Sequence, residues 1–161
     1  MPNRSSELNA PTMAVLQKFR VIYGSMRRHF RDIEDRCGLP ASQVWVLQEV
    51  QNSPGIGITE LSQCIGVHQS TCSQLVEKLE AKGLMVKQRK LDDQRRVGLH
   101  LSEQATAVLG LAPGPFEGVL PQALQGLTDE TLEQLHFNLA QVIAQLTDRD
   151  EHAAERPLSD L

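Results

Sequence analysis

The chain of 161 residues lacks any run of 18 or more apolar residues, so the sequence contains no candidate membrane-spanning helix. Its first dozen residues, MPNRSSELNAPT, lack the apolar segment of a signal peptide. The three cysteines, Cys37, Cys64 and Cys72, are odd in number and show no CxxC spacing, which argues against a disulfide framework. We therefore expect one domain or one compact subunit in a reducing cytoplasm, without a membrane partner.

Signatures of catalysis are also lacking. The five histidines are scattered along the chain, and neither a glycine-rich phosphate loop nor a GxSxG motif occurs. An active site needs convergent acid, base or nucleophilic groups. The sequence therefore predicts that the protein is not an enzyme and that it has no cofactor and no metal site.

Cations are unevenly distributed, and none occurs between residues 37 and 77. The net charge is −4, yet residues 78–100 carry seven cations and three acids, whereas residues 102–161 carry two cations and ten acids. Such a basic island can bind a polyanion, because charges attract over about 10 Å at ordinary salt. Charge clusters of this kind also occur on surfaces that have no such partner.

Hydrophobic periodicity predicts a mainly helical chain. Residues 12–36 form a long predicted helix, and a second one runs from Ser42, its expected cap, to about Gln51. The clearest helix spans 128–147, with Thr128 as N-cap. The apolar stripe of the first helix comprises Val15, Phe19, Ile22, Met26, Phe30 and Ile33, and that of the last comprises Leu132, Leu135, Leu139, Val142, Ile143 and Leu146.

Two short helices and a hairpin are predicted between residues 58 and 102. TELSQCIG, with Thr59 as expected N-cap, and the segment 68–83 form a helix-turn-helix pattern. LMVKQRK and RRVGLHLS then alternate on either side of the turn LDDQ. The predicted fold class is mainly α with a small β-hairpin (α+β). A winged helix-turn-helix at 40–101 is flanked by dimerisation helices at 1–36 and 102–148, and 149–161 is a flexible tail.

The two terminal helices carry more apolar surface than one small core can cover, and a stripe of that size is normally buried by a partner. Homodimerisation through both ends of the chain is the simplest solution. The alternative is that both helices pack on their own domain.

The second helix of the helix-turn-helix offers candidate DNA-binding residues. Cys72, Leu75, Val76 and Leu79 are spaced to face the core. Hydroxyl and amide side chains, which can hydrogen-bond to base edges in a major groove, occupy the other side. The alternative is an ordinary solvated face. The candidates are Ser70, Ser73 and Gln74, with Gln69 and Lys78 at the margins and Thr59 and His68 at the starts of the two helices.

The hairpin supplies the cations. Arg95 and Arg96 at its tip can reach a neighbouring minor groove, where negative potential is concentrated. Lys87, Arg89 and Lys90 would contact phosphates, which position a protein without specifying sequence. Asp93 lies two residues before Arg95 and is expected to form a charge-assisted hydrogen bond with its guanidinium. The alternative is an ordinary charged surface turn.

Residues 58–105 resemble the MarR (multiple-antibiotic-resistance regulator) family of bacterial winged-helix repressors. The resemblance rests on ST…LVEKLEAKGL, on the wing motif Asp93-Gln94-Arg95 and on the following Leu101-Ser102. It implies a homodimer on a pseudo-palindromic operator, with Arg95 in the minor groove and Asp93 supporting it. Gln74 departs from the family, because a cation is frequent there, so the bases that the helix contacts are open.

The resemblance also implies repression that a small, often phenolic, ligand relieves. It places a pocket where the first, second and fifth helices meet, with His29, Phe30 and Trp45 as candidate lining; core packing is the alternative for each. Two other functions remain open: a redox-sensing regulator that uses one of the three cysteines, and a winged-helix module that binds only proteins. A steep loss of affinity with salt would distinguish DNA binding from protein binding.

Overall fold

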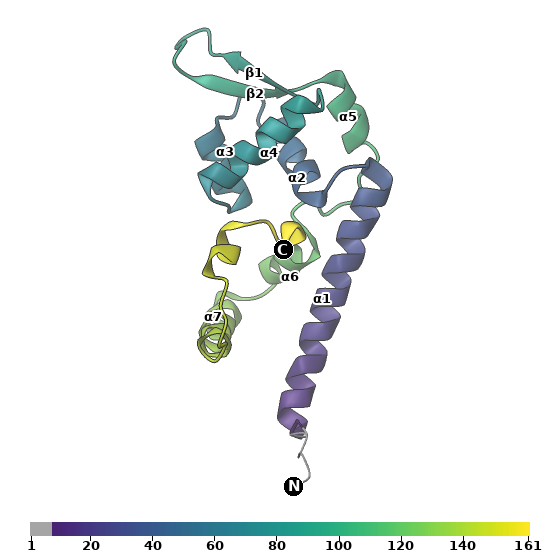
Figure 1. Cartoon of the computed structure of the whole chain (residues 1–161), viewed down its shortest axis with the longest axis vertical. Helices are drawn as coiled ribbons and strands as arrows, with labels where there is room; N and C mark the ends of the chain where they lie inside the picture. The colour runs from purple at the N-terminus through teal and green to yellow at the C-terminus, as the bar shows by residue number, and fades with distance from the viewer. Residues whose placement is uncertain (1–7) are drawn as a thin grey trace.

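The computed structural model describes residues 8–161. The predicted N-terminal segment, and the expectation about a signal peptide, fall partly on residues 1–7, which lie outside the described residues. Helix α1 (Ala10–Cys37) begins where the Asn9 side chain accepts a hydrogen bond from the Thr12 amide, 2.9 Å away, and ends at Gly38, whose φ of 68° is left-handed. It forms the long axis of the molecule in Figure 1. The predicted helix is confirmed.

The winged helix-turn-helix occupies one end of α1. It consists of α2 (Ala41–Asn52), α3 (Ile58–Ile65), α4 (Gln69–Ala81) and the antiparallel hairpin of β1 (Met85–Arg89) and β2 (Val97–Leu101). Ile56 pairs with Leu99 and adds a third short segment to the hairpin. A side chain at Gly98 would lie 2.8 Å from the Gly55 carbonyl oxygen, so this close approach requires glycine.

Two predicted helix caps were wrong. Pro40, not Ser42, precedes α2, and Ser42 lies buried inside the helix. Gly57, not Thr59, precedes α3. In both places the hydroxyl bonds to a distant side chain instead of the local backbone. The second strand also begins at Val97 instead of Arg95.

The hydrophobic core lies almost entirely within this winged-helix end. All four residues predicted for the inner face of α4 are buried, as is Leu99 of the hairpin. Most apolar residues of α2 and α3 are buried with them, namely Ala41, Val44, Val46, Leu47, Val50, Leu61 and Ile65. Helix α5 (Glu103–Leu109), which the Ser102 hydroxyl caps by accepting from the Ala105 amide at 3.2 Å, adds Ala105 and Leu109. The core therefore fixes α4 and the hairpin relative to one another.

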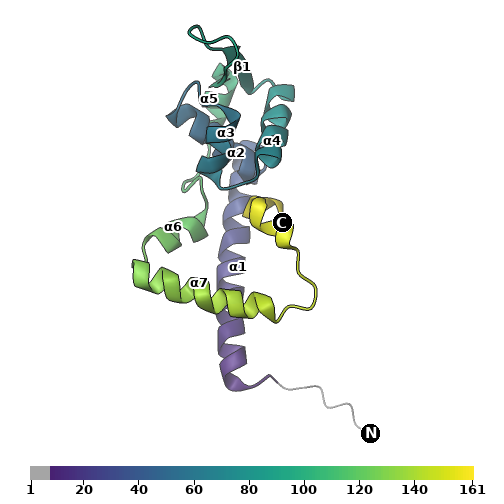
Figure 2. The same ribbon diagram turned by 90° about the vertical axis from the view of Figure 1, so that its left-hand side faces the viewer.

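The remaining helices extend away from that core. They are the unpredicted α6 (Val119–Gln125) and α7 (Asp129–Ala144), which begins at its predicted cap Thr128. In the described chain α7 buries none of its residues, and α1 buries only Ile33. Figure 1 shows α7 standing apart from α1, and Figure 2 shows that the two helices cross. Phe19 on α1 and Ile143 on α7 are 41% and 51% exposed, so both apolar stripes are uncovered over part of their length in the single chain.

The C-terminal segment differs from the flexible tail that its composition predicts. It forms two 3-10 turns, η1 (Glu151–Glu155) and η2 (Leu158–Asp160), and η2 contacts α2. Pro157 between the turns is buried. Within residues 8–161 no helix has the length and hydropathy to cross a bilayer.

Candidate nucleic-acid interface

The outer face of α4 is polar, as predicted. Gln69, Ser70 and Gln74 are exposed, Ser73 is half-buried, and Lys78 is exposed farther along the same helix. The first turn of α4 contains no acid. A helix end with exposed amides and hydroxyls, and without a carboxylate, can approach DNA without repelling phosphates.

Hydrogen bonds hold the start of α4 in place. The His68 ring nitrogen Nδ1 caps the helix by accepting from the Ser70 amide at 3.3 Å, and it lies 2.7 Å from the Ser70 hydroxyl. The Gln69 side-chain amide donates to the Thr59 hydroxyl at 3.1 Å. Four of the predicted DNA-binding residues thus form two hydrogen-bonded pairs, and the Gln69–Thr59 pair links the first turns of α4 and α3.

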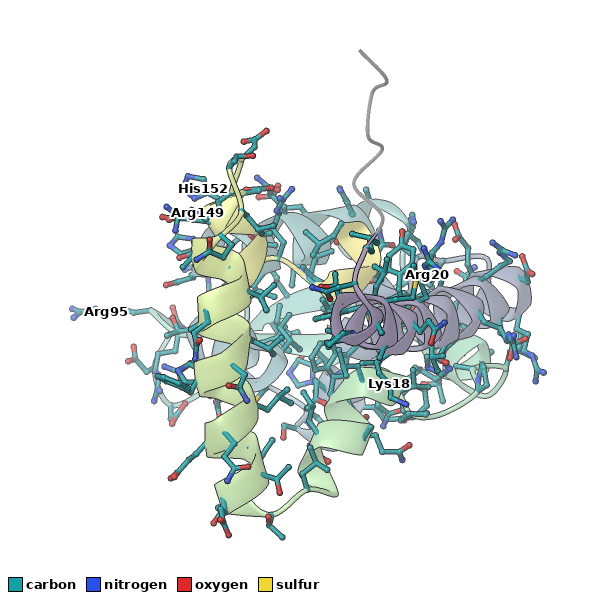
Figure 3. All side chains as sticks on the ribbon, turned by 90° about the horizontal axis from the view of Figure 1, so that it is seen from below. Lys18, Arg20, Arg95, Arg149 and His152 are labelled. Carbon is teal, nitrogen blue, oxygen red and sulfur yellow. The ribbon has the colours of Figure 1, made fainter. Side chains whose placement is uncertain are left out.

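The wing projects beyond α4 at the same end of the molecule (Figure 1). Arg89, Arg95 and Arg96 are exposed, and Figure 3 shows Arg95 extending well beyond the rest of the molecule. The turn is closed by the Arg96 amide, which donates to the Asp93 carbonyl at 2.9 Å, and by the Lys90 amide, which donates to the Arg96 carbonyl at 2.9 Å. The wing therefore presents its cations on an ordered turn.

Asp93 supports this turn differently from the prediction. Its Oδ1 accepts from the backbone amide of Arg95 at 3.0 Å. Among residues 8–161, no ion pair joins Asp93 to the Arg95 guanidinium, so the predicted side-chain bond was wrong. The guanidinium keeps its hydrogen-bond donors for an external partner.

Lys87 has a protein partner. Its Nζ lies 2.9 Å from the Glu80 carboxylate on α4, and both side chains are partly exposed. The pair joins β1 to α4, and it neutralises a charge that was expected to contact phosphate. Lys87 therefore contributes less to the positive potential of this surface than Arg89 or Arg95.

A cavity of about 270 Å³ lies between α1, α2, the end of α3, α6 and the C-terminal segment. Phe30 and Trp45 line it, as predicted, together with Phe116 from the loop before α6. His29 does not: its Nε2 donates to the Pro115 carbonyl at 2.8 Å and holds that loop against α1. The third side of the cavity is formed by α6 and the C-terminal segment instead of the fifth helix.

Sequence reasoning missed the C-terminal contribution to this cavity. Ala153, Pro157 and Leu158 lie in a segment dominated by charged residues, so their apolar character was the only available signal. No periodic pattern accompanies it, because 3-10 turns are too short to produce one.

The cysteines do not share one environment. Burial raises the pKa of the Cys72 thiol to about 11, and burial also raises that of Cys37, partly offset by the nearby Arg36. Cys64 is exposed on α3. Since the thiolate is the reactive form, Cys72 is a buried apolar residue of the α4 core face and is protected from oxidation. No cluster of His, Cys, Asp or Glu in the described residues could hold a metal ion.

Comparison with known proteins identifies related sequences. The model of the MarR family matches residues 37–96. A putative transcriptional regulatory protein for the hcr operon of Thauera aromatica is 29% identical over 85 residues, 53% of this chain and about half (51%) of that protein. The homoprotocatechuate degradative operon repressor of Escherichia coli is 24% identical over 123 residues, 76% of this chain and 83% of the repressor.

Solved structures share the fold. A mutant of MarR from Escherichia coli, crystallised with operator DNA, aligns with a TM-score of 0.54 at 18% identity, covering 81% of this chain and 96% of that one. The organohalide-sensing regulator RdhR, bound to 2,4-dichlorophenol, aligns with a TM-score of 0.53 at 20% identity, covering 97% and 92%. Residues 37–96, which span the helix-turn-helix and most of the wing, therefore match the MarR family, and the fold of the chain is similar to that of solved MarR structures.

Proposed function

We infer that this protein is a cytoplasmic transcriptional repressor, not an enzyme, and that it binds a pseudo-palindromic operator as a homodimer. A small aromatic ligand in the cavity releases it from DNA. In this function α4 lies in the major groove, and Arg95 reaches the adjoining minor groove.

One observation carries the proposal: the polar face of α4 and the wing share one end of the molecule, while uncovered apolar helices form the other (Figure 1). Pairing two copies through α1 and α7 buries the apolar stripes and leaves both α4 helices exposed. On B-DNA two such helices would enter successive major grooves about 34 Å apart. The two-fold symmetry of such a dimer explains why the operator would be pseudo-palindromic.

The positive charges at the winged-helix end also favour DNA as the partner. Arg89, Lys90, Arg95 and Arg96 project from a hairpin on a chain whose C-terminal part is acidic. Each phosphate that a cation neutralises changes the slope of log affinity against log salt by about −0.9. Two wings per dimer double that contribution, so binding should weaken steeply as salt rises.

The cavity supports the ligand part of the proposal. Phe30, Trp45 and Phe116 provide aromatic walls, and the volume of about 270 Å³ is suited to a single-ring compound. The dichlorophenol-bound relative and the repressor of an aromatic degradation operon favour a phenol.

The test is a titration of the protein against labelled DNA from upstream of its own gene, with competitor DNA, at several salt concentrations. Sequence-specific binding with a steep salt dependence is expected, and 2,4-dichlorophenol should reduce it. Absence of specific DNA binding would favour the protein-interaction alternative. Release by peroxide, with no effect of phenols, would favour the redox alternative.

A further inference from the structure

The last twelve residues, Asp150–Leu161, form a segment that we call the strap. It starts near the end of α7, where Figure 3 shows Arg149 and His152 together, and returns to the winged-helix end beside α2 (Figure 2). An ion pair between Asp150 and Arg156 closes its first turn, and the buried Pro157 anchors its middle. Although it is rich in charged residues, the strap is docked on the core.

Two hydrogen bonds attach the strap to separate helices. The Ser42 hydroxyl, at the start of α2, donates to Oδ1 of Asp160 at 2.7 Å. The His68 backbone amide donates to the Glu155 carbonyl at 3.1 Å. Since His68 is the N-cap of α4, the second bond connects the strap directly to the first turn of the helix that carries Gln69 and Ser70.

The strap is also a wall of the cavity. Phe30, Trp45 and Phe116 form the aromatic side. The strap supplies the facing residues, which are Ala153, Ala154, Arg156, Pro157, Leu158 and Ser159. Without the strap, the site would be an open groove on α1, α2 and α6. A compound in this cavity must therefore contact the strap and the aromatic side chains at once.

We propose that the strap is the closing wall of the ligand cavity and transmits its occupancy to α4 through the His68–Glu155 hydrogen bond. A single-ring phenol between the strap and the aromatic wall holds the strap closed, because it adds contacts that exist only in the closed state. The held strap fixes the turn between α3 and α4 in the ligand-bound geometry. The inference rests on the proposed function, since it describes how the same cavity regulates DNA binding.

The few contacts that attach the strap to the core allow it to open and close in response to a ligand. It is held by two hydrogen bonds and one buried proline, so it opens at less cost than the core helices. Its other end is tethered to α7, none of whose residues is fully buried in the single chain. The strap can therefore respond to a ligand while the core is unchanged.

The first experiment needs no DNA. Amide hydrogen exchange is measured at His68, with and without 2,4-dichlorophenol, and emission is recorded from Trp45, the one tryptophan of the chain. The phenol should quench Trp45 and slow exchange at His68. A chain ending at Arg149 should exchange at His68 at the same faster rate whether or not the phenol is present. An unchanged His68 rate on adding the phenol to the full chain overturns the inference.

The second experiment compares Asp160→Ala with Asp160→Asn. Alanine removes the acceptor of the Ser42 bond, whereas asparagine keeps an oxygen there. Asp160→Ala should weaken binding of the phenol about fivefold, the factor that one such hydrogen bond contributes. It should also reduce the effect of the phenol on operator affinity, and Asp160→Asn should restore both.

These results separate the two proposals. If the wild type binds no specific DNA, the proposed function fails, while Trp45 emission and His68 exchange still decide the role of the strap. If operator binding and its response to the phenol are identical in the wild type and Asp160→Ala, the strap has no regulatory role and the inference is overturned.

Discussion

Asp93 provides the sharpest test of how the wing is built. Its Oδ1 accepts from the Arg95 backbone amide, and no ion pair with the Arg95 guanidinium occurs in the described residues. Asp93→Ala removes the acceptor, whereas Asp93→Asn keeps an Oδ1 at the same position and removes only the charge. The two substitutions therefore separate a backbone role from a charge role.

The expected magnitude follows from the exposure of the bond. A hydrogen bond to a charged group contributes about 1.5–3 kcal/mol, and solvent screening at this exposed turn reduces it to about 1 kcal/mol. A dimer presents two wings, so Asp93→Ala should cost about 2 kcal/mol, or about 30-fold in operator affinity. Asp93→Asn should stay within about threefold of the wild type, because the acceptor is retained and repulsion of phosphate is reduced.

The assay is fluorescence anisotropy with a labelled operator at several salt concentrations. Gln94→Ala is the matched control, since it alters the same turn without changing a charge. Arg95→Ala should give the weakest operator binding of the series. It should also make the slope of log affinity against log salt shallower by about 1.8, from two lost contacts per dimer. If Asp93→Asn binds as weakly as Asp93→Ala, the carboxylate charge acts on the guanidinium and our account of the wing is refuted.

Three further predictions address other parts of the molecule. Gln74→Ala should change base preference by about 1–3 kcal/mol at one position, measured by competition with operator variants; an unchanged preference would remove Gln74 from the base-contacting residues. Ile143→Glu, on the apolar stripe of α7, should yield monomers in analytical ultracentrifugation without loss of helical circular dichroism, because no residue of α7 is buried in the single chain; a persistent dimer would place the interface elsewhere. Ellman's reagent at pH 8 should label exposed Cys64 quickly and Cys72 only after unfolding, since a pKa of about 11 leaves about one thiolate in a thousand; rapid labelling of Cys72 would contradict its burial.

The sequence predicted features that depend on neighbours along the chain. Thr128 caps α7 as expected, and Ser102 caps α5 in the same way, because each hydroxyl accepts from an amide three residues ahead. The buried face of α4 followed from its spacing in the same way. These signals are local, so a single sequence contains them in full.

Other features depend on partners that are distant in sequence. Ser42 was expected to cap α2, but its hydroxyl bonds to Asp160, which lies 118 positions later in the chain. Thr59 was expected to cap α3, but it accepts from Gln69 of the next helix. A hydroxyl near a helix start can serve either purpose, and only the tertiary structure determines which. The strap was missed for the same reason, because its order comes from its contacts with α2 and α4 and not from its own composition.

In the wing, the sequence motif predicted the correct pair of residues but the wrong bonding atoms. The spacing of Asp93 and Arg95 predicted that the two residues interact, and they do. An aspartate commonly bonds to the backbone two residues ahead, and this amide is already fixed by the turn. A bond from the Asp93 carboxylate to the Arg95 guanidinium would instead immobilise the arginine side chain, at a cost of about 2 kcal/mol of conformational entropy. The backbone bond therefore orders the turn while leaving the charge of Arg95 available, and a cation already neutralised by its own aspartate would attract phosphate less strongly.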